Sequence, residues 1–206
     1  LIFTAYQGTK NSSDNTFNSA KNLAESIGAT FVHVEIDELV HNYTKMIEDK
    51  IGRDLSWKTD DLSLQNIQAR VRAPGIWFFA NLKNQLLLAT SNRSEVAVGY
   101  CTMDGDTAGS ISPIAGIEKF WLKKWLIWLE TDGCEVKGKH IRIEGLHDVN
   151  QLQPTAELRP LETKQTDEKD LMPYEVLNMI ENYAIRDKYS PTEIYTLLLV
   201  GELAGF

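Results

Sequence analysis

The chain has 206 residues, enough for one domain with a sizeable core. Its net charge of −8 argues against nonspecific nucleic-acid binding, which needs a basic surface. No apolar run approaches the roughly 20 residues of a membrane helix, since the nearest candidate, residues 121–129, is interrupted by Lys123 and Lys124. Cys101 and Cys134 show no CxxC pattern and no disulfide framework, which favours reduced thiols in a cytoplasmic protein.

Strand-like apolar runs alternate with helical periodicity in the first part of the chain. The expected elements are a strand at residues 1–5, a polar turn at 7–14, a helix at 17–27, a strand at 31–36 and a helix capped by Asp37 that reaches residue 51. This order predicts an α/β fold, a doubly wound parallel sheet with helices on both faces.

The later part of the chain continues the pattern less regularly. The expected elements are a helix at 62–83, a buried parallel strand at 86–89, a helix at 118–130, a strand at 139–144 and two proline-initiated helices at 173–186 and 191–203. The acidic stretch 157–170 predicts a solvated loop. A chain that starts within a strand and stops within a helix is expected to be a fragment, incomplete at both ends.

Polar side chains follow the predicted strand at 86–89. Thr90 and Glu95 come directly after it, and Asp106 and Lys119 follow a glycine-rich loop. Because ligands in open α/β sheets lie beyond the carboxyl ends of the strands, these residues suit a site for polyphosphate and a metal ion.

The same segment also has a purely structural interpretation. Asn92 can cap a helix with Glu95 as its partner three residues on, and Gly105-Asp106 can be an ordinary turn. The cap leaves Thr90 without a role, and a helix N-terminus after a strand also suits an anion. The structural and functional roles are compatible.

Asn66 and Arg70 lie four residues apart and so share one face of the predicted helix at 62–83. Arg72 lies about 200° around the helix from Arg70, so the two arginines are not expected to bind one phosphate. Arg70 with Asn66 suits an anionic ligand. The alternative is an exposed, charged helix face.

Several other residues carry weaker signals. The histidines have no metal-ligand spacing, so no zinc site is predicted. Trp121, Trp125 and Trp128 form one helical stripe, typical of a core or a subunit interface. The block PTAELRP at 154–160 has the composition of a surface loop.

Together these segments resemble the glutamine-dependent NAD synthetases of the ATP-pyrophosphatase superfamily. The matching motifs are N-x-x-A-R-x-R at 66–72, the segment from Thr90 to Lys119 with Ser94-Glu95, Gly99-Tyr100, Gly105-Asp106 and Pro113, and the blocks PTAELRP and LMPYEVL at 154–160 and 171–177. Ser110 replaces an acid of the ammonia-dependent members, as in the glutamine-dependent branch, and Asn178 stands where Asp is usual.

The resemblance implies a role for each matching residue. Asn66 and Arg70 would bind deamido-NAD, Thr90 and Thr155 would contact ATP, Glu95 would hold Mg²⁺, and Asp106 and Lys119 would be catalytic. It also implies an adenine nucleotide alpha-hydrolase-like fold and a homo-oligomer. The acidic net charge and the lack of a long apolar run predict no nucleic-acid or membrane partner.

The implied reaction is ATP-dependent amidation of deamido-NAD to NAD through an adenylated intermediate. Glutamine would supply the ammonia, and AMP and pyrophosphate would be released. The family's S-G-G-x-D-S loop and glutaminase domain are not in this sequence, so residues 1–206 are expected to form a partial synthetase domain, inactive alone. The alternatives are a noncatalytic nucleotide-binding or assembly module and another amidating enzyme of the superfamily, such as a GMP synthetase.

Overall fold

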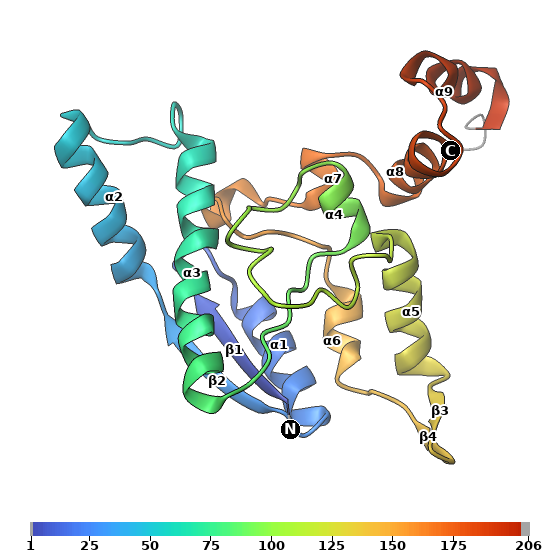
Figure 1. Cartoon of the computed structure of the whole chain (residues 1–206), viewed down its shortest axis with the longest axis horizontal. Helices are drawn as coiled ribbons and strands as arrows, with labels where there is room; N and C mark the ends of the chain where they lie inside the picture. The colour runs from blue at the N-terminus through green and yellow to red at the C-terminus, as the bar shows by residue number, and fades with distance from the viewer. Residues whose placement is uncertain (1, 203–206) are drawn as a thin grey trace.

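A computed structural model describes residues 2–202. Strands β1 (Phe3–Gly8) and β2 (Thr30–Glu35) pair in parallel and in continuous register, and helix α1 (Asp14–Ser26) connects them (Figure 1). This β–α–β unit confirms the predicted α/β class with parallel strands and helices. Within the described residues the parallel sheet consists of these two strands.

Helices lie on both faces of this sheet because side chains alternate along β1. Phe3 points to one face, where its ring lies 5.2 Å from that of Phe79 in helix α3 (Asp61–Lys83). Tyr6 points to the other face, where its ring lies 5.3 Å from that of Phe17 in α1. The predicted covering of both faces is therefore present at this strand.

Helix α1 begins at Asp14, earlier than its apolar periodicity predicts. The Ser13 hydroxyl accepts a hydrogen bond from the Thr16 N–H at 3.2 Å, and this cap starts the helix before its first apolar residue. Strand β1 in turn continues to Gly8, so the polar turn is shorter than predicted.

Helix α2 (Asp37–Ile51) has the predicted extent, but the prediction that Asp37 caps it is wrong. Its carboxylate instead accepts a hydrogen bond from the Lys10 N–H at 2.8 Å, and Ile36 takes the cap position without a side-chain bond. Asp37 therefore stabilises the turn that follows β1 through this hydrogen bond. Helix α2 buries no residue and lies beside α3, away from the sheet (Figure 1).

The strand predicted at 86–89 does not form, and this prediction is wrong. Within the described residues only an isolated bridge joins Leu88 to Ile111. Leu87 O and Ala89 N bond to the returning loop at Ser110 and Ile111, both at 2.8 Å, rather than to β1 or β2. The apolar run is half buried rather than enclosed, since Leu88 is 50% exposed.

A small hairpin and a short helix follow helix α5 (Lys119–Thr131). Strands β3 (Cys134–Val136) and β4 (Lys139–Ile141) pair in antiparallel fashion, so the strand predicted at 139–144 is shorter and has a partner that was not predicted. Lys137 and Gly138 both have positive φ, as a tight hairpin turn requires. Helix α6 (Leu146–Gln151) was also missed.

The stretch 157–170 is not the solvated loop that its acidity predicts. It contains a short 3₁₀ helix, η1 (Leu161–Thr163), and helix α7 (Asp167–Asp170). Leu158 and Asp167 are only 7% and 4% exposed. The Gln165 side-chain oxygen accepts hydrogen bonds from the N–H groups of Leu158 and Arg159, which folds the stretch back on itself.

The two predicted C-terminal helices are present. Helix α8 (Tyr174–Glu181) ends in a π-helical turn, η2 (Asn182–Arg186), and helix α9 (Pro191–Leu197) ends in another, η3 (Leu198–Glu202). Pro191 is the first residue of α9 as predicted, whereas Pro173 is the cap residue of α8. The predicted end of the last helix, at residue 203, lies outside the described residues.

Two further observations bear on the class of protein. Among residues 2–202, no helix combines the length and apolarity needed to cross a membrane. Cys101 and Cys134 are free, partly buried thiols.

Candidate active site

Helix α4 (Arg93–Ala97) starts with a reciprocal pair of hydrogen bonds. The Glu95 N–H donates to Asn92 Oδ1 at 3.1 Å, and the Asn92 N–H donates to Glu95 Oε2 at 3.1 Å. This is the capping box of the structural interpretation. It uses one carboxylate oxygen of Glu95 and leaves Oε1 for another partner.

Lys119, at the start of α5, is that partner. Its Nζ donates to Glu95 Oε1 at 2.9 Å, and its backbone N–H donates to Ser94 Oγ at 3.2 Å. The side chains of Lys119 and Glu95 are 19% and 18% exposed, so their ion pair is partly desolvated. The structure thus joins two predicted site residues from different elements.

A second carboxylate, Asp167, lies near the same ammonium, with Oδ2 3.9 Å from Lys119 Nζ. Asp167 also accepts a hydrogen bond from the Tyr174 hydroxyl at 2.7 Å. Burial raises the pKa of Asp167, and the Tyr174 hydroxyl and the Lys119 ammonium offset only part of the increase. In the sequence Asp167 belongs to the acidic stretch and is the acid between the two matching blocks PTAELRP and LMPYEVL, but nothing in the local pattern revealed its burial.

The predicted residues Asn66 and Asp106 meet through Thr102. The Thr102 N–H donates to Asp106 Oδ2 at 2.7 Å, and the Thr102 hydroxyl donates to Asn66 Oδ1 at 2.9 Å. Asn66 and Asp106 line one cavity of about 120 Å³. The Ser91 hydroxyl donates to the Asp106 carbonyl at 3.1 Å and links this group to the segment before α4.

The loop that carries Asp106 lies too close to its neighbours for side chains at two of its glycines. A Cβ on Gly105 would lie 2.8 Å from the Ala69 carbonyl carbon, and one on Gly109 would lie 2.5 Å from the Ala89 nitrogen. Such approaches require glycine. The loop is therefore wedged between α3 and the 86–89 segment, which fixes Asp106 more firmly than an ordinary turn would.

Arg70 and Arg72 have different surroundings, as their spacing predicts. The exposed Arg70 donates from Nε to the Met103 carbonyl at 3.1 Å, next to the Asn66 contact with Thr102. Arg72 donates from Nε to the Gln7 carbonyl at 3.2 Å, and burial lowers its pKa. Arg72 therefore ties α3 to β1, whereas Arg70 lines a cavity of about 560 Å³.

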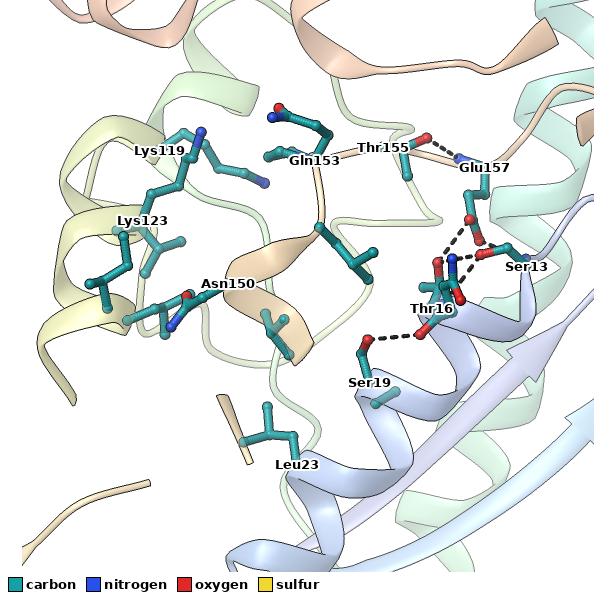
Figure 2. A pocket seen from close by; sticks show the side chains of 18 residues that line it. Ser13, Thr16, Ser19, Leu23, Lys119, Lys123, Asn150, Gln153, Thr155 and Glu157 are labelled. Carbon is teal, nitrogen blue, oxygen red and sulfur yellow. Dashed lines mark hydrogen bonds between the residues drawn. The ribbon is translucent and has the colours of Figure 1, made fainter. Parts of the chain in front are cut away.

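Thr155 lines a cavity of about 580 Å³ between α1, α5, α6 and the segment after α6. Figure 2 shows Thr155 and Glu157 on one side, with Lys119 and Lys123 across from them. The Thr155 hydroxyl accepts a hydrogen bond from the Glu157 N–H at 3.2 Å. The apolar lining comes from Ala20, Leu23, Leu122, Leu126, Ile127, Val149 and Leu152.

The predicted site residues thus form two groups rather than one. Lys119 joins Glu95 to the cavity of Thr155, while Asn66 and Asp106 form the second group, with Arg70 at its edge. Thr90 belongs to neither group. It is exposed, and its side chain bonds no other described residue.

Arg159 anchors the 154–170 segment, a role that the sequence did not reveal. It donates from Nε and Nη2 to Asp61 of α3 at 3.0–3.2 Å and from Nη1 to Asp170 of α7 at 2.8–3.0 Å. The Tyr100 hydroxyl donates to the same Asp170 at 2.9 Å. These bonds connect the segment that carries Thr155 to α3 and to the loop that carries Asp106.

The side chains present suit a magnesium ion that is held mainly by phosphate oxygens. Within the described residues no group of three or more acidic, histidine or cysteine side chains forms a metal cluster. Mg²⁺ commonly takes one or two protein carboxylates together with substrate phosphates. Glu95 would fit this pattern through Oε1, which accepts the Lys119 ammonium here, because its other oxygen is committed to the cap.

Known structures share this architecture. A crystal structure of a glutamine-dependent NAD(+) synthetase from Cytophaga hutchinsonii superposes with a TM-score of 0.78 and 48% identity, over 96% of this chain and 29% of that one. The fold is therefore that of the NAD synthetases, which the resemblance in sequence predicted.

Sequence comparison leads to the family itself. The model of the NAD synthase family matches residues 3–202, and this chain belongs to that family. A glutamine-dependent NAD(+) synthetase from Aquifex aeolicus is 35% identical over 189 residues, which cover 92% of this chain and 30% of that protein. The one from Saccharomyces cerevisiae is 32% identical over 219 residues, with coverages of 97% and 29%. The chain spans about 30% of the length of these relatives.

Proposed function

We propose that this chain is part of a glutamine-dependent NAD synthetase, a ligase that amidates deamido-NAD to NAD with ATP. The observation that carries the proposal is the 2.9 Å ion pair between Lys119 and Glu95, placed where α4 and α5 begin and bordering the cavity of Thr155. Family membership supports it and favours this reaction over that of a GMP synthetase.

The chemistry requires activation, because a carboxylate is a poor acyl donor. The nicotinate carboxylate of deamido-NAD attacks the α-phosphorus of ATP and forms an adenylate, and pyrophosphate leaves. Ammonia from glutamine then attacks the acyl carbon, AMP leaves, and a proton is lost from nitrogen to give the amide. The protein must therefore bind two nucleotides, neutralise phosphate charge and orient ammonia.

Lys119 and Glu95 would serve the phosphates. In the structure the Glu95 carboxylate forms an ion pair with the Lys119 ammonium, and Asp167 lies near the same ammonium. When Mg·ATP is present, Glu95 Oε1 would hold the metal, and Lys119 Nζ would turn to the α-phosphate and the leaving pyrophosphate. Mg²⁺ would supply further neutralisation of phosphate charge. Thr90 and Thr155 would donate their hydroxyls to the nucleotide.

Asn66, Arg70 and Asp106 would serve deamido-NAD and ammonia. Arg70 engages its protein partner through Nε, which leaves the terminal nitrogens of the guanidinium for a phosphate. Asp106 has one oxygen committed to the Thr102 N–H, and its second oxygen would accept a hydrogen bond from ammonia and orient it. Each of these roles is carried over from the family to the matching residue of this chain.

We also propose a second copy of the chain as a partner and the cytoplasm as the location. The candidate contact is the tryptophan stripe of α5, because Trp121, Trp125 and Trp128 remain 52%, 44% and 42% exposed. Free thiols at Cys101 and Cys134 suit a reducing compartment.

The test compares the complete natural polypeptide that contains this chain with the 206-residue chain alone. Each receives deamido-NAD, Mg·ATP and either glutamine or ammonia, and formation of NAD and AMP is measured. The complete polypeptide is expected to form both products in equal amounts, and the chain alone neither. ATP binding without AMP formation by the complete polypeptide would instead identify the noncatalytic nucleotide-binding module.

A further inference from the structure

Glu181, the last residue of α8, is a buried carboxylate that the proposed chemistry does not use. It is 3% exposed, and neither of its oxygens has a well-aligned hydrogen-bond partner among the described residues. A carboxylate in such surroundings costs free energy. Its position therefore calls for a compensating role.

The neighbours of Glu181 belong to the helices that carry the Glu95–Lys119 pair. Helix α8 packs against α4 and α5 (Figure 1). Burial raises the pKa of Glu181, the Ser94 hydroxyl and the Arg93 guanidinium act against this, and Glu118 adds to the increase. These are the polar and charged groups that face it from α4 and from the start of α5.

Ser94 interacts with both Glu181 and Lys119. It is 1% exposed, and its oxygen accepts a hydrogen bond from the Lys119 N–H at 3.2 Å. Because that contact uses an oxygen lone pair, the hydroxyl proton needs an acceptor of its own, and the Glu181 carboxylate is the acidic group beside it.

We propose that Glu181 is a positioning residue that holds Lys119 in place through the hydroxyl of Ser94. The carboxylate attracts the hydroxyl proton, which turns the Ser94 lone pairs to the Lys119 N–H and fixes the start of α5. The Lys119 ammonium is thereby aimed at Glu95 and at the phosphates of a bound nucleotide. The inference rests on the proposed function, because that function gives Lys119 its role.

Nuclear magnetic resonance of the ¹⁵N-labelled 206-residue chain tests the connection directly. The backbone amide signal of Lys119 is followed as the pH is raised, in the wild-type chain and in the Glu181→Gln and Ser94→Ala variants. A titration of this signal with a midpoint above the ordinary value for glutamate is expected in wild type, and it should be lost in both variants but retained in Asp167→Asn, which removes the other carboxyl with a raised pKa near Lys119. Glu175→Gln, on the exposed face of α8, is the matched control and should retain it.

Hydrogen exchange of the same amide supplies a second measurement. Ser94→Ala and Glu181→Leu should each speed exchange about five- to tenfold, and the double variant should exchange no faster than Ser94→Ala alone. If Glu181→Leu fails to fold, the near-isosteric Glu181→Gln still decides through the titration.

The proposal is overturned if the titration of the Lys119 signal in wild type is lost in Asp167→Asn, or if it persists in the Glu181→Gln, Asp167→Asn double variant. Additive exchange effects of Ser94→Ala and Glu181→Leu would also overturn it, because they would show two independent contacts. Neither measurement needs turnover. If both come out as expected while loss of the Lys119 ammonium leaves NAD formation unchanged, the proposed function fails and the positioning role stands.

Discussion

The junction of α4 with α5 and the loop that carries Asp106 hold their charged residues in different ways. At the junction, Glu95 and Lys119 neutralise each other, and each makes a further hydrogen bond near its helix start. In the loop, Asp106 is exposed, is held by one backbone N–H and forms no salt bridge within the described residues, although its charge acts at longer range on the buried Arg72 guanidinium. We therefore expect the charges at the junction to contribute to both stability and the proposed function, and the charge of Asp106 to contribute less to folding.

Removal of the Lys119 ammonium should have the largest effect. Lys119→Met is expected to lower the rate of NAD formation by about 10²–10³ and to destabilise the fold by about 1–3 kcal/mol, because Glu95 loses its partner in a partly buried site. Steady-state kinetics of the complete natural polypeptide and urea unfolding of the chain measure the two effects.

Lys124→Met is the matched control, since Lys124 is exposed on the same helix and contacts the rings of Phe120 and Trp121 rather than an acid. It should change neither quantity appreciably. Equal losses in the Lys119 and Lys124 variants would show that the junction has no special role.

Glu95→Gln should have the next largest effect. The amide oxygen can still accept the Asn92 N–H and preserve the cap, but the charge needed by Lys119 and by a metal ion is lost. We expect a decrease in rate of about tenfold to a hundredfold, together with a higher Mg²⁺ requirement in a magnesium titration. An unchanged magnesium dependence would exclude Glu95 as the metal ligand.

Asp106→Asn tests the loop, the second of the two regions compared above. The amide oxygen can replace Oδ2 as acceptor for the Thr102 N–H, so the free energy of unfolding should change by less than about 0.5 kcal/mol. The rate should decrease by about tenfold, and higher ammonia concentrations should restore part of it. A large loss of stability would instead mean that Asp106 is chiefly structural.

The pH dependence of stability gives the smallest effect. Burial raises the folded-state pKa of Asp167, so the folded chain holds this proton more tightly than the unfolded chain does. Stability should therefore decrease as the pH rises from the unfolded pKa through the folded one. Asp167→Asn removes this contribution. The stability of the variant relative to wild type should therefore be higher at neutral pH than at acidic pH.

Urea unfolding over that pH range measures the difference between Asp167→Asn and wild type. Glu162→Gln, in the same segment but exposed, should follow the wild-type curve. A constant difference between Asp167→Asn and wild type at all pH values would show that Asp167 titrates normally.

Periodicity was sufficient to predict the β–α–β unit and the long helices, because their apolar spacing reflects burial against one neighbour. It failed at residues 86–89, where the apolar run bonds to a returning loop and not to a strand. It also failed for Asp167, since the surroundings of that acid include Tyr174, seven residues further along the chain, and Lys119 of the distant helix α5. Local composition contains no information about such partners.

The candidate site shows the same difference between local contacts, which were predictable, and long-range contacts, which were not. The capping box of Asn92 and Glu95 was predictable because both partners lie within one helical turn. Glu95 and Lys119 were both predicted as site residues, but their ion pair was not, and neither were the contacts of Arg159 and Glu181. Long-range contacts between polar residues leave no periodic signal in a single sequence.

The most direct test of the proposed reaction is the exchange of labelled pyrophosphate into ATP, catalysed by the complete natural polypeptide with Mg²⁺ and without ammonia. Adenylation of deamido-NAD predicts exchange that depends on deamido-NAD and falls by about 10²–10³ in Lys119→Met. ATP binding without any deamido-NAD-dependent exchange would contradict the proposed role of the α4–α5 junction.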